Sequence, residues 1–116
     1  SRHHLGTEID INSVNSADYQ QGCAGQSCQL AVYTWLIANA ANYGFCQPYN
    51  TNRLVKTEPW HWSYKPVSKQ LTAQHMSTVT AGDLAGLGIA GESTIVSNFD
   101  LYHRGFISDI NPDCLS

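Results

Sequence analysis

The middle of the sequence concentrates side chains that could do chemistry. Residues 57–64, TEPWHWSY, place carboxylate, imidazole and aromatic groups within one short stretch. The aromatic rings recur at every second position, so a strand would put them on one face and His61 on the other. Pro59 disfavours helix at the preceding residue, so we expect a strand that begins near Pro59, with the Glu58 carboxylate turned toward His61. Taken alone, the stretch also fits an edge strand whose rings fill the core while His61 faces solvent.

The start of the sequence, SRHHLGTEIDI, supplies further side chains that could bind a metal. A glycine permits a kink after His3, and the residues that follow alternate as a strand, with Glu8 and Asp10 on one face and isoleucines on the other. A histidine before the kink and a carboxylate after it can therefore converge with His61. Two nitrogens and one oxygen are a ligand set of catalytic zinc, which keeps a fourth position open for water. Glu58 is then left over as a general base.

These two motifs, SxHxxGxExD at residues 1–10 and EPWH at residues 58–61, resemble the paired signature of the D-alanyl-D-alanine carboxypeptidase (VanY-like) family of zinc peptidases. That family also includes L,D-peptidases, phage endolysins and a hedgehog-type domain related by fold. The resemblance implies that His3, Asp10 and His61 bind Zn²⁺ and that Glu58 is the catalytic base. It covers roughly the first 65 residues, including the segment 35–45, which resembles the family's helix ending in Gly-Phe.

The sequence departs from the family pattern at two places. Glu8 stands where many members have a small residue, which leaves open whether it supports a ligand from behind or competes for the metal. Family members also have helices upstream of the first motif, with an arginine that helps to hold the substrate. We therefore expect residues 1–65 to form a catalytic core without that upstream part, and residues 66–116 to form a C-terminal extension packed on the same domain.

Length and composition limit the remaining possibilities. The chain of 116 residues, 42% of them hydrophobic, is enough for one domain with a modest core. We expect an α+β fold in which a small antiparallel sheet carries the zinc site between helices, which is the LAS/hedgehog type that the resemblance implies. Only 13% of the residues are charged and the net charge is -3, so no nucleic-acid partner is expected. No apolar run is long enough for a membrane span, and we expect a monomer.

Four cysteines indicate an oxidising compartment, and hence a secreted or periplasmic protein. A structural zinc site would need two close cysteine pairs, whereas Cys46 and Cys114 lie far apart in the sequence, so disulfides are favoured. A helix over residues 29–43 would be on the order of 20 Å long. Because bridged Cα atoms lie within about 7 Å of each other, this helix would separate Cys28 from Cys46. We therefore predict the pairs Cys23–Cys28 and Cys46–Cys114.

The elements around the motifs follow from periodicity and from turn residues. The predicted helix over residues 29–43 ends at Gly44, and we expect Trp35 and Phe45 to lie in the core. Residues 45–49 resemble a short strand. In the C-terminal part, residues 67–76 fit either a helix or irregular structure, and residues 93–103 predict a short helix. The spacing of Gly86, Gly88 and Gly91 matches a dinucleotide-binding loop, but no strand precedes it, so we interpret it as a connector.

The other reactive residues are assigned less specific roles. His4 follows a predicted ligand, and neighbouring residues of a strand point to opposite faces, so we expect His4 to be exposed or to support the site indirectly. We expect structural roles for His75 and His103. The sequence has no Gly-x-Ser-x-Gly motif, and cysteines in disulfides cannot act as nucleophiles, so covalent catalysis is not expected.

Together these observations predict a zinc peptidase that hydrolyses an amide bond in a peptidoglycan stem peptide, releasing a terminal D-alanine. Three alternatives remain open. The first is a catalytically silent, zinc-stabilised binding domain. The second is an endopeptidase that cuts a cross-link. The third is a binding module held together by disulfides without metal.

Overall fold

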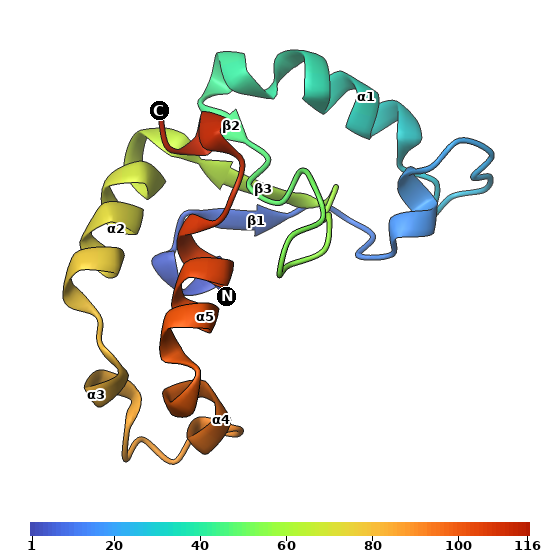
Figure 1. The fold of residues 1–116 in the computed structure, drawn as a ribbon. Coiled ribbons are helices and arrows are strands. Elements are labelled where there is room, and N and C mark those ends of the chain that lie inside the picture. Colours follow the sequence, from blue (N-terminus) through green and yellow to red (C-terminus); the bar gives the residue numbers. More distant parts are fainter.

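The computed structural model describes residues 1–116 and has at its centre a three-stranded antiparallel sheet. The strands are β1 (Glu8–Asp10), β2 (Phe45–Cys46) and β3 (His61–Tyr64), in the order β1-β3-β2. The register pairs Asp10 with His61 on one side of β3 and Cys46 with Ser63 on the other (Figure 1). This α+β arrangement, with a small antiparallel sheet between helices, is the fold class expected from the sequence.

The central strand β3 forms where the sequence predicts it, although Trp60 lies in the turn before it. The backbone N–H of His61 donates to the Glu58 carbonyl at 3.2 Å, which closes this turn just after Pro59. Along the strand the side chains alternate. Trp62 is buried against the ring of Tyr33, whereas His61 lies on the opposite face.

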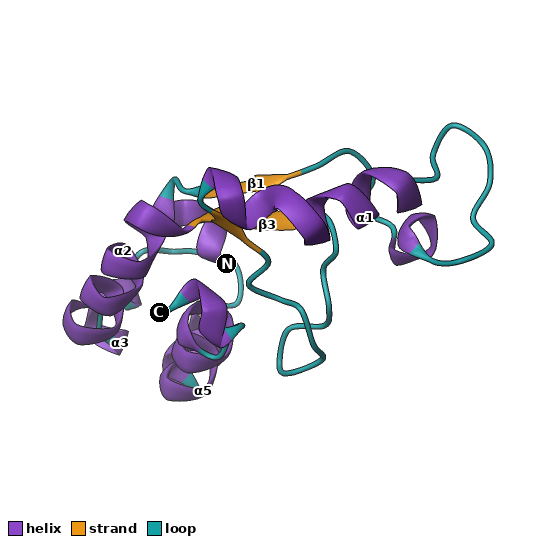
Figure 2. Ribbon diagram, turned by 90° about the horizontal axis from the view of Figure 1, so that it is seen from above, coloured by secondary structure: helices purple, strands orange, loops and turns teal.

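The predicted helix over residues 29–43 is observed as α1 (Leu30–Asn39), extended by a 3-10 turn over Ala40–Tyr43. It ends at Gly44, whose φ is 85° and whose backbone N–H donates to the carbonyls of Ala40 and Ala41. The expectation that Trp35 lies in the core is wrong, because its side chain is 52% exposed. The reason is geometric: α1 runs past the ends of the short strands, so much of its length has no layer to pack against (Figures 1 and 2). Phe45 is half-buried, and its ring packs at a tilt against that of Tyr64.

The first motif begins with a 3-10 turn rather than a strand. This turn spans Arg2–Leu5 and ends at Gly6, whose φ of 75° makes the predicted kink before β1. His4 is exposed, as expected, but the physical reason is different from the expected one. His3 and His4 diverge because they are neighbours on a tight helical turn, not because they alternate along a strand.

The C-terminal part is mostly helical. Helix α2 (Lys65–Thr78) starts directly after β3, with a proline in its first turn, and resolves the ambiguity that the sequence left over this segment. Three short helices follow: α3 (Ala81–Leu84), α4 (Glu92–Ser97) and α5 (Phe99–His103). The predicted helix over residues 93–103 is thus broken at Asn98. The glycine-rich segment is a connector between α3 and α4, as expected.

The chain then returns to the sheet through a π-helical turn, Arg104–Ser108, and a 3-10 turn, Pro112–Cys114. Both predicted disulfides, Cys23–Cys28 and Cys46–Cys114, are confirmed. The second joins β2 to the C-terminal turn, where Tyr49 and Ile110 complete a small buried cluster. The side-chain amide of Asn111 also donates to the Gln47 carbonyl at 3.0 Å. The C-terminal segment is therefore packed on the sheet, whereas the division at residue 65 stays a prediction.

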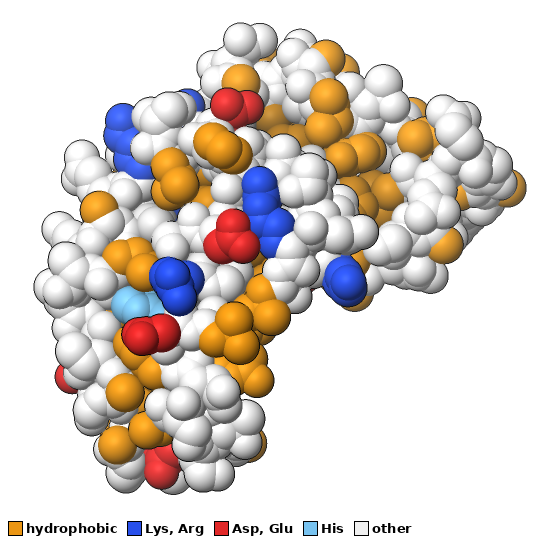
Figure 3. All heavy atoms as spheres, viewed as in Figure 1, with side chains coloured by type: hydrophobic (Ala, Val, Ile, Leu, Met, Phe, Trp, Pro, Cys, Tyr) orange, Lys and Arg blue, Asp and Glu red, His pale blue; other side chains and the backbone are white.

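The molecule is extended for its size. Its principal dimensions are 46 × 28 × 20 Å and its radius of gyration is 15.6 Å, against about 13 Å for a typical domain of this length. Helices α2 and α5 run away from the sheet as one arm, and α1 forms another (Figure 1). In the hollow below α1 and along α5, apolar side chains reach the surface (Figure 3). None of the helices combines the length and apolar character needed to cross a membrane.

Candidate metal centre

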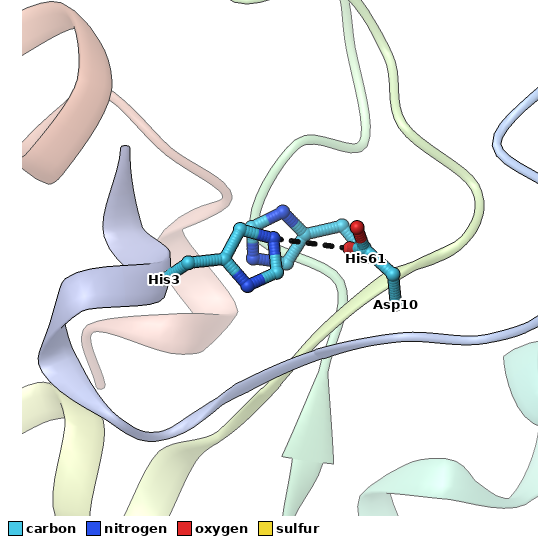
Figure 4. Close-up of side chains that lie close together, drawn as sticks. All are labelled: His3, Asp10 and His61. Carbon is cyan, nitrogen blue, oxygen red and sulfur yellow. Dashed lines mark ion pairs between the residues drawn. The ribbon is translucent and has the colours of Figure 1, made fainter.

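Three side chains with metal-binding atoms meet where the first motif faces the central strand. His3 comes from the 3-10 turn, Asp10 from the end of β1 and His61 from the start of β3 (Figure 4). The pairing of β1 with β3 sets Asp10 opposite His61, and the kink at Gly6 folds His3 back toward both. His3 Nε2 lies 3.1 Å from Asp10 Oδ1, and the His3 and His61 rings are 4.5 Å apart.

This arrangement fits a zinc ion. One ligand atom from each of the three residues lies within 4.8 Å of the other two. The set offers two imidazole nitrogens and one carboxylate oxygen, which is a combination that catalytic zinc uses. His61 is buried, while His3 and Asp10 are exposed, so the group is anchored in the protein at His61 and open to solvent on the side of the other two residues. Such an open side leaves room for water and a substrate.

Glu58 lies beside this group. Its Oε2 is 3.0 Å from Nδ1 of His61, and its carboxylate is 28% exposed. The backbone holds it there, because its N–H donates to the Tyr49 carbonyl at 2.9 Å and its carbonyl accepts from His61. A carboxylate that borders the open side of a metal site can exchange protons with water there.

Glu8 lies against His61 and is enclosed by hydrogen-bonding partners. Its side chain has no exposed surface. Oε1 lies 3.2 Å from His61 Nε2 and accepts from Arg2 Nε at 2.8 Å, while Oε2 accepts from the hydroxyls of Thr7 at 2.8 Å and Ser63 at 2.5 Å. In this structure Glu8 therefore supports His61 from behind and does not compete with Asp10.

Arg2 is a residue whose role the sequence analysis missed. It is fully buried, and besides Glu8 its guanidinium donates to the Thr72 hydroxyl at 2.8 Å and the Ile107 carbonyl at 2.6 Å. Thr72 lies on α2 and Ile107 in the π-helical turn, so the arginine joins the C-terminal part to the motif. Its position one residue before His3, next to a strand with an inward carboxylate, is the signal that could have indicated a buried ion pair.

The hydrogen bonds around His61 determine how the site titrates. Burial alone would raise the pKa of Glu8, but the hydrogen bonds from His61 and Ser63, with the Arg2 cation, lower it to about 2. Burial alone would lower the pKa of His61, but the hydrogen bonds to Glu58 and Glu8 outweigh it and raise that pKa above its usual value. Glu8 is therefore ionised at neutral pH and holds the Nε2 side of the imidazole, leaving Nδ1 directed toward Glu58.

Tyr49 is a second residue that the sequence analysis did not identify. The edge of its ring packs against His61, with the ring centroids 4.9 Å apart, and its hydroxyl donates to the Phe106 carbonyl at 2.6 Å. Burial raises the pKa of this hydroxyl well above its usual value. Tyr49 thus fixes one wall of the site and is committed to a structural hydrogen bond. The remaining histidines, His4, His75 and His103, lie outside the group.

The similarity to known proteins agrees with this geometry. A curated relative, an uncharacterized protein of Haemophilus influenzae, is 27% identical over 119 residues, which cover 92% of this chain and 89% of the relative. No solved structure matches the chain. The model of the VanY family, D-alanyl-D-alanine carboxypeptidase, matches residues 1–67, a segment that contains both motifs and all the residues around the candidate metal centre except those of the C-terminal part. The chain therefore belongs to the VanY family of D-alanyl-D-alanine carboxypeptidases.

Proposed function

We propose that this chain is a zinc-dependent peptidase that hydrolyses peptidoglycan stem peptides and releases their terminal D-alanine. The observation that carries the proposal is the position of Glu58, 3.0 Å from His61 and at the edge of the group formed with His3 and Asp10. A site that only stabilised the fold would have no need of a partly exposed carboxylate at its open side. The family match supports a peptidase that acts on the cell wall.

His3, Asp10 and His61 would hold the zinc. The chemistry that zinc supplies in such a site is Lewis acidity toward the scissile carbonyl and toward water. Glu58 takes the proton of the attacking water and passes it to the leaving amine, acting as base and then as acid. Glu8 would accept a hydrogen bond from Nε2–H of His61, which would fix the tautomer and leave the Nδ1 lone pair for the metal. The buried Tyr49 ring limits rotation of the imidazole.

The location and the partner follow from the same proposal. The two disulfides are compatible with an extracytoplasmic protein, which is where peptidoglycan peptides are found. We propose a secreted or periplasmic monomer whose partner is the stem peptide.

Elemental analysis tests the ligand set. Compared with the wild-type protein, His61→Ala should lose one equivalent of zinc, because the two remaining ligands are exposed and hold the ion weakly. Asp100→Asn, which replaces an exposed carboxylate on α5, is the matched control and should keep the wild-type content. An unchanged zinc content in His61→Ala would contradict the ligand set.

The role of Glu58 is tested separately by measuring the turnover of a variant that lacks its carboxylate. Glu58→Gln keeps the size of the side chain but cannot accept the proton, so D-alanine release from a peptide ending in D-Ala-D-Ala should fall by about 10²–10⁴-fold while zinc content is retained. Glu92→Gln, which changes a half-buried glutamate on α4 outside the proposed site, should leave the rate unchanged. A near wild-type rate in Glu58→Gln would exclude this mechanism. Stoichiometric zinc with no turnover in the wild-type protein would instead support a zinc-stabilised binding domain.

A further inference from the structure

A second group of histidines lies on the far side of the first motif. His4 comes from the 3-10 turn, His75 from the last turns of α2 and His103 from the end of α5. All three line a cavity of about 610 Å³ whose other walls are mostly apolar side chains of the helical arm. The centroid of the His75 ring lies 4.9 Å from that of His4 and 4.8 Å from that of His103. Three separate elements thus bring imidazoles together at one end of the cavity.

The distance between the two inner histidines is that of a pair of metal ligands. Nδ1 of His75 lies 2.8 Å from Nε2 of His103. Nitrogens bound to one ion at about 2.0–2.1 Å are roughly 2.9–3.4 Å apart when they subtend 90° to 109° at the metal. A metal would therefore need only a small separation of the two rings. In this structure Nδ1 of His4 contacts the Ser1 carbonyl oxygen, so His4 would have to turn its side chain to bind the same ion.

The surroundings favour neutral imidazole at His75. Burial, the nearby His4 and His103, and more distant positive groups lower the pKa of His75 below its usual value. None of the residues that line the cavity is an aspartate or glutamate, so no carboxylate stabilises the protonated rings. His103 is buried, His75 is half-buried and His4 is exposed, so water can complete the coordination sphere from the side of His4. Neutral imidazole is a good ligand for zinc and its neighbours in the first transition series.

We propose that His75 and His103, with His4 as a third ligand, form a second site for a divalent transition-metal ion such as Zn²⁺. This site is distinct from the group of His3, Asp10 and His61, and the proposal does not depend on the peptidase function. An ion there joins α2 to α5 and both helices to the turn that carries the first motif. It acts as a structural clamp on the helical arm, which has few other buried contacts.

Cobalt(II) binding to untagged, metal-free protein tests this proposal. His3→Ala/His61→Ala removes two ligands of the first site and serves as the parent. Titration followed by calorimetry and by visible absorption should show one Co²⁺ per parent molecule, with d–d bands of nitrogen ligation. Adding His75→Gln should abolish this binding at concentrations that saturate the parent. Adding Gln74→Ala, an exposed neighbour on the same helix, should leave it unchanged.

Thermal unfolding provides a second measurement. Because an ion that binds only the folded state stabilises it, Co²⁺ should raise the Tm of the parent but not of the His75→Gln variant. His103→Gln repeats the test on the other inner ligand, and circular dichroism shows whether each variant is folded. Absence of Co²⁺ binding by the parent, or equal binding by the parent and both glutamine variants, would overturn the proposal. The two rings would then be a simple hydrogen-bonded pair, and any ion that bound would be adventitious.

Discussion

At the scale of single residues, the candidate metal centre depends on a buried ion pair that touches no substrate. Arg2 and Glu8 have no exposed side-chain surface, and their contacts link His61 to α2 and to the π-helical turn. Removing one member of a buried pair leaves the other charge without compensation. Such changes cost about 3–5 kcal/mol, a large part of the stability of a small domain.

Arg2→Ala should therefore lower the free energy of unfolding by about 3–5 kcal/mol in urea denaturation. Lys69→Ala, which removes an exposed cation of α2, should change it by less than about 0.5 kcal/mol. Equal stabilities of the two variants would mean that the Arg2–Glu8 pair contributes nothing net to folding.

The pKa of Glu8 also predicts how stability depends on pH. In the folded, metal-free protein this pKa is about 2, against 4.5 for an unperturbed glutamate. On acidification, Glu8 is therefore protonated at a lower pH in the folded state than in the unfolded state. Its ionised carboxylate stabilises the folded state fully above pH 4.5, and this stabilisation is lost as the pH falls toward 2. The difference corresponds to roughly 3 kcal/mol. Denaturant midpoints measured between pH 7 and pH 2 should fall more steeply in the wild type than in Glu8→Gln, and parallel curves would contradict the assignment.

At the scale of elements, the passage from α1 into β2 depends on a glycine. Gly44 has a φ of 85°, and a Cβ placed there would come within 2.9 Å of a ring carbon of Tyr64 and 3.3 Å of the Pro66 ring. The backbone conformation and the lack of space act together, because Lys65 N–H also donates to the Gly44 carbonyl at 2.8 Å. This glycine thus lets α1 end against the start of α2 while β2 pairs with β3.

Gly44→Ala should destabilise the protein by about 1–3 kcal/mol, combining the left-handed backbone with the clash. Gly22→Ala is a matched control, because Gly22 has a similar φ of 89° but a Cβ added to it would have no atom within 4 Å. Thermal melts of both variants separate the two effects. If the losses are equal, the contact with Tyr64 and Pro66 has no energetic weight.

At the scale of the whole molecule, a small core makes the long-range disulfide important. Only 19 of the 116 residues are buried, and the Cys46–Cys114 bridge is at the centre of the main buried cluster. The bridge closes a loop across 68 positions of sequence, and in the chain-entropy model such a loop contributes about 4 kcal/mol. The Cys23–Cys28 bridge spans 5 positions, and the same model gives about 2 kcal/mol.

Cys46→Ala/Cys114→Ala should therefore lower the Tm clearly more than Cys23→Ala/Cys28→Ala, and urea denaturation should give the larger loss for the first pair. Glu58 and His61 lie within the loop that the Cys46–Cys114 bridge closes, but neither bridge supplies an atom to the proposed site. Zinc content should therefore stay at the wild-type level at temperatures where each variant is folded. A larger loss for the short bridge would mean that local strain or contacts, rather than loop closure, determine the stabilities.

Much of this protein could be predicted from local sequence patterns. Alternation around His61, the proline before it and the glycine before β1 determine strands and a kink, because these are preferences of the backbone over a few residues. The disulfide pairing was also predicted correctly, and the length of one helix helped by excluding a bridge between Cys28 and Cys46. The structure brings together the side chains of His3, Asp10 and His61 that the two motifs indicated as ligands. Their roles in metal binding and catalysis stay proposals.

Only the tertiary structure decided which contacts form between distant segments. The sequence could not tell whether Glu8 supports a ligand from behind or competes for the metal, because that depends on its ion pair with Arg2, whose guanidinium is held by contacts with α2 and the π-helical turn. It also misplaced Trp35, because an apolar face is buried only if another layer is long enough to cover it, and these strands are short. The meeting of His75 with His103 likewise depends on how two helices far apart in sequence lie against each other, and local propensities carry no information about that.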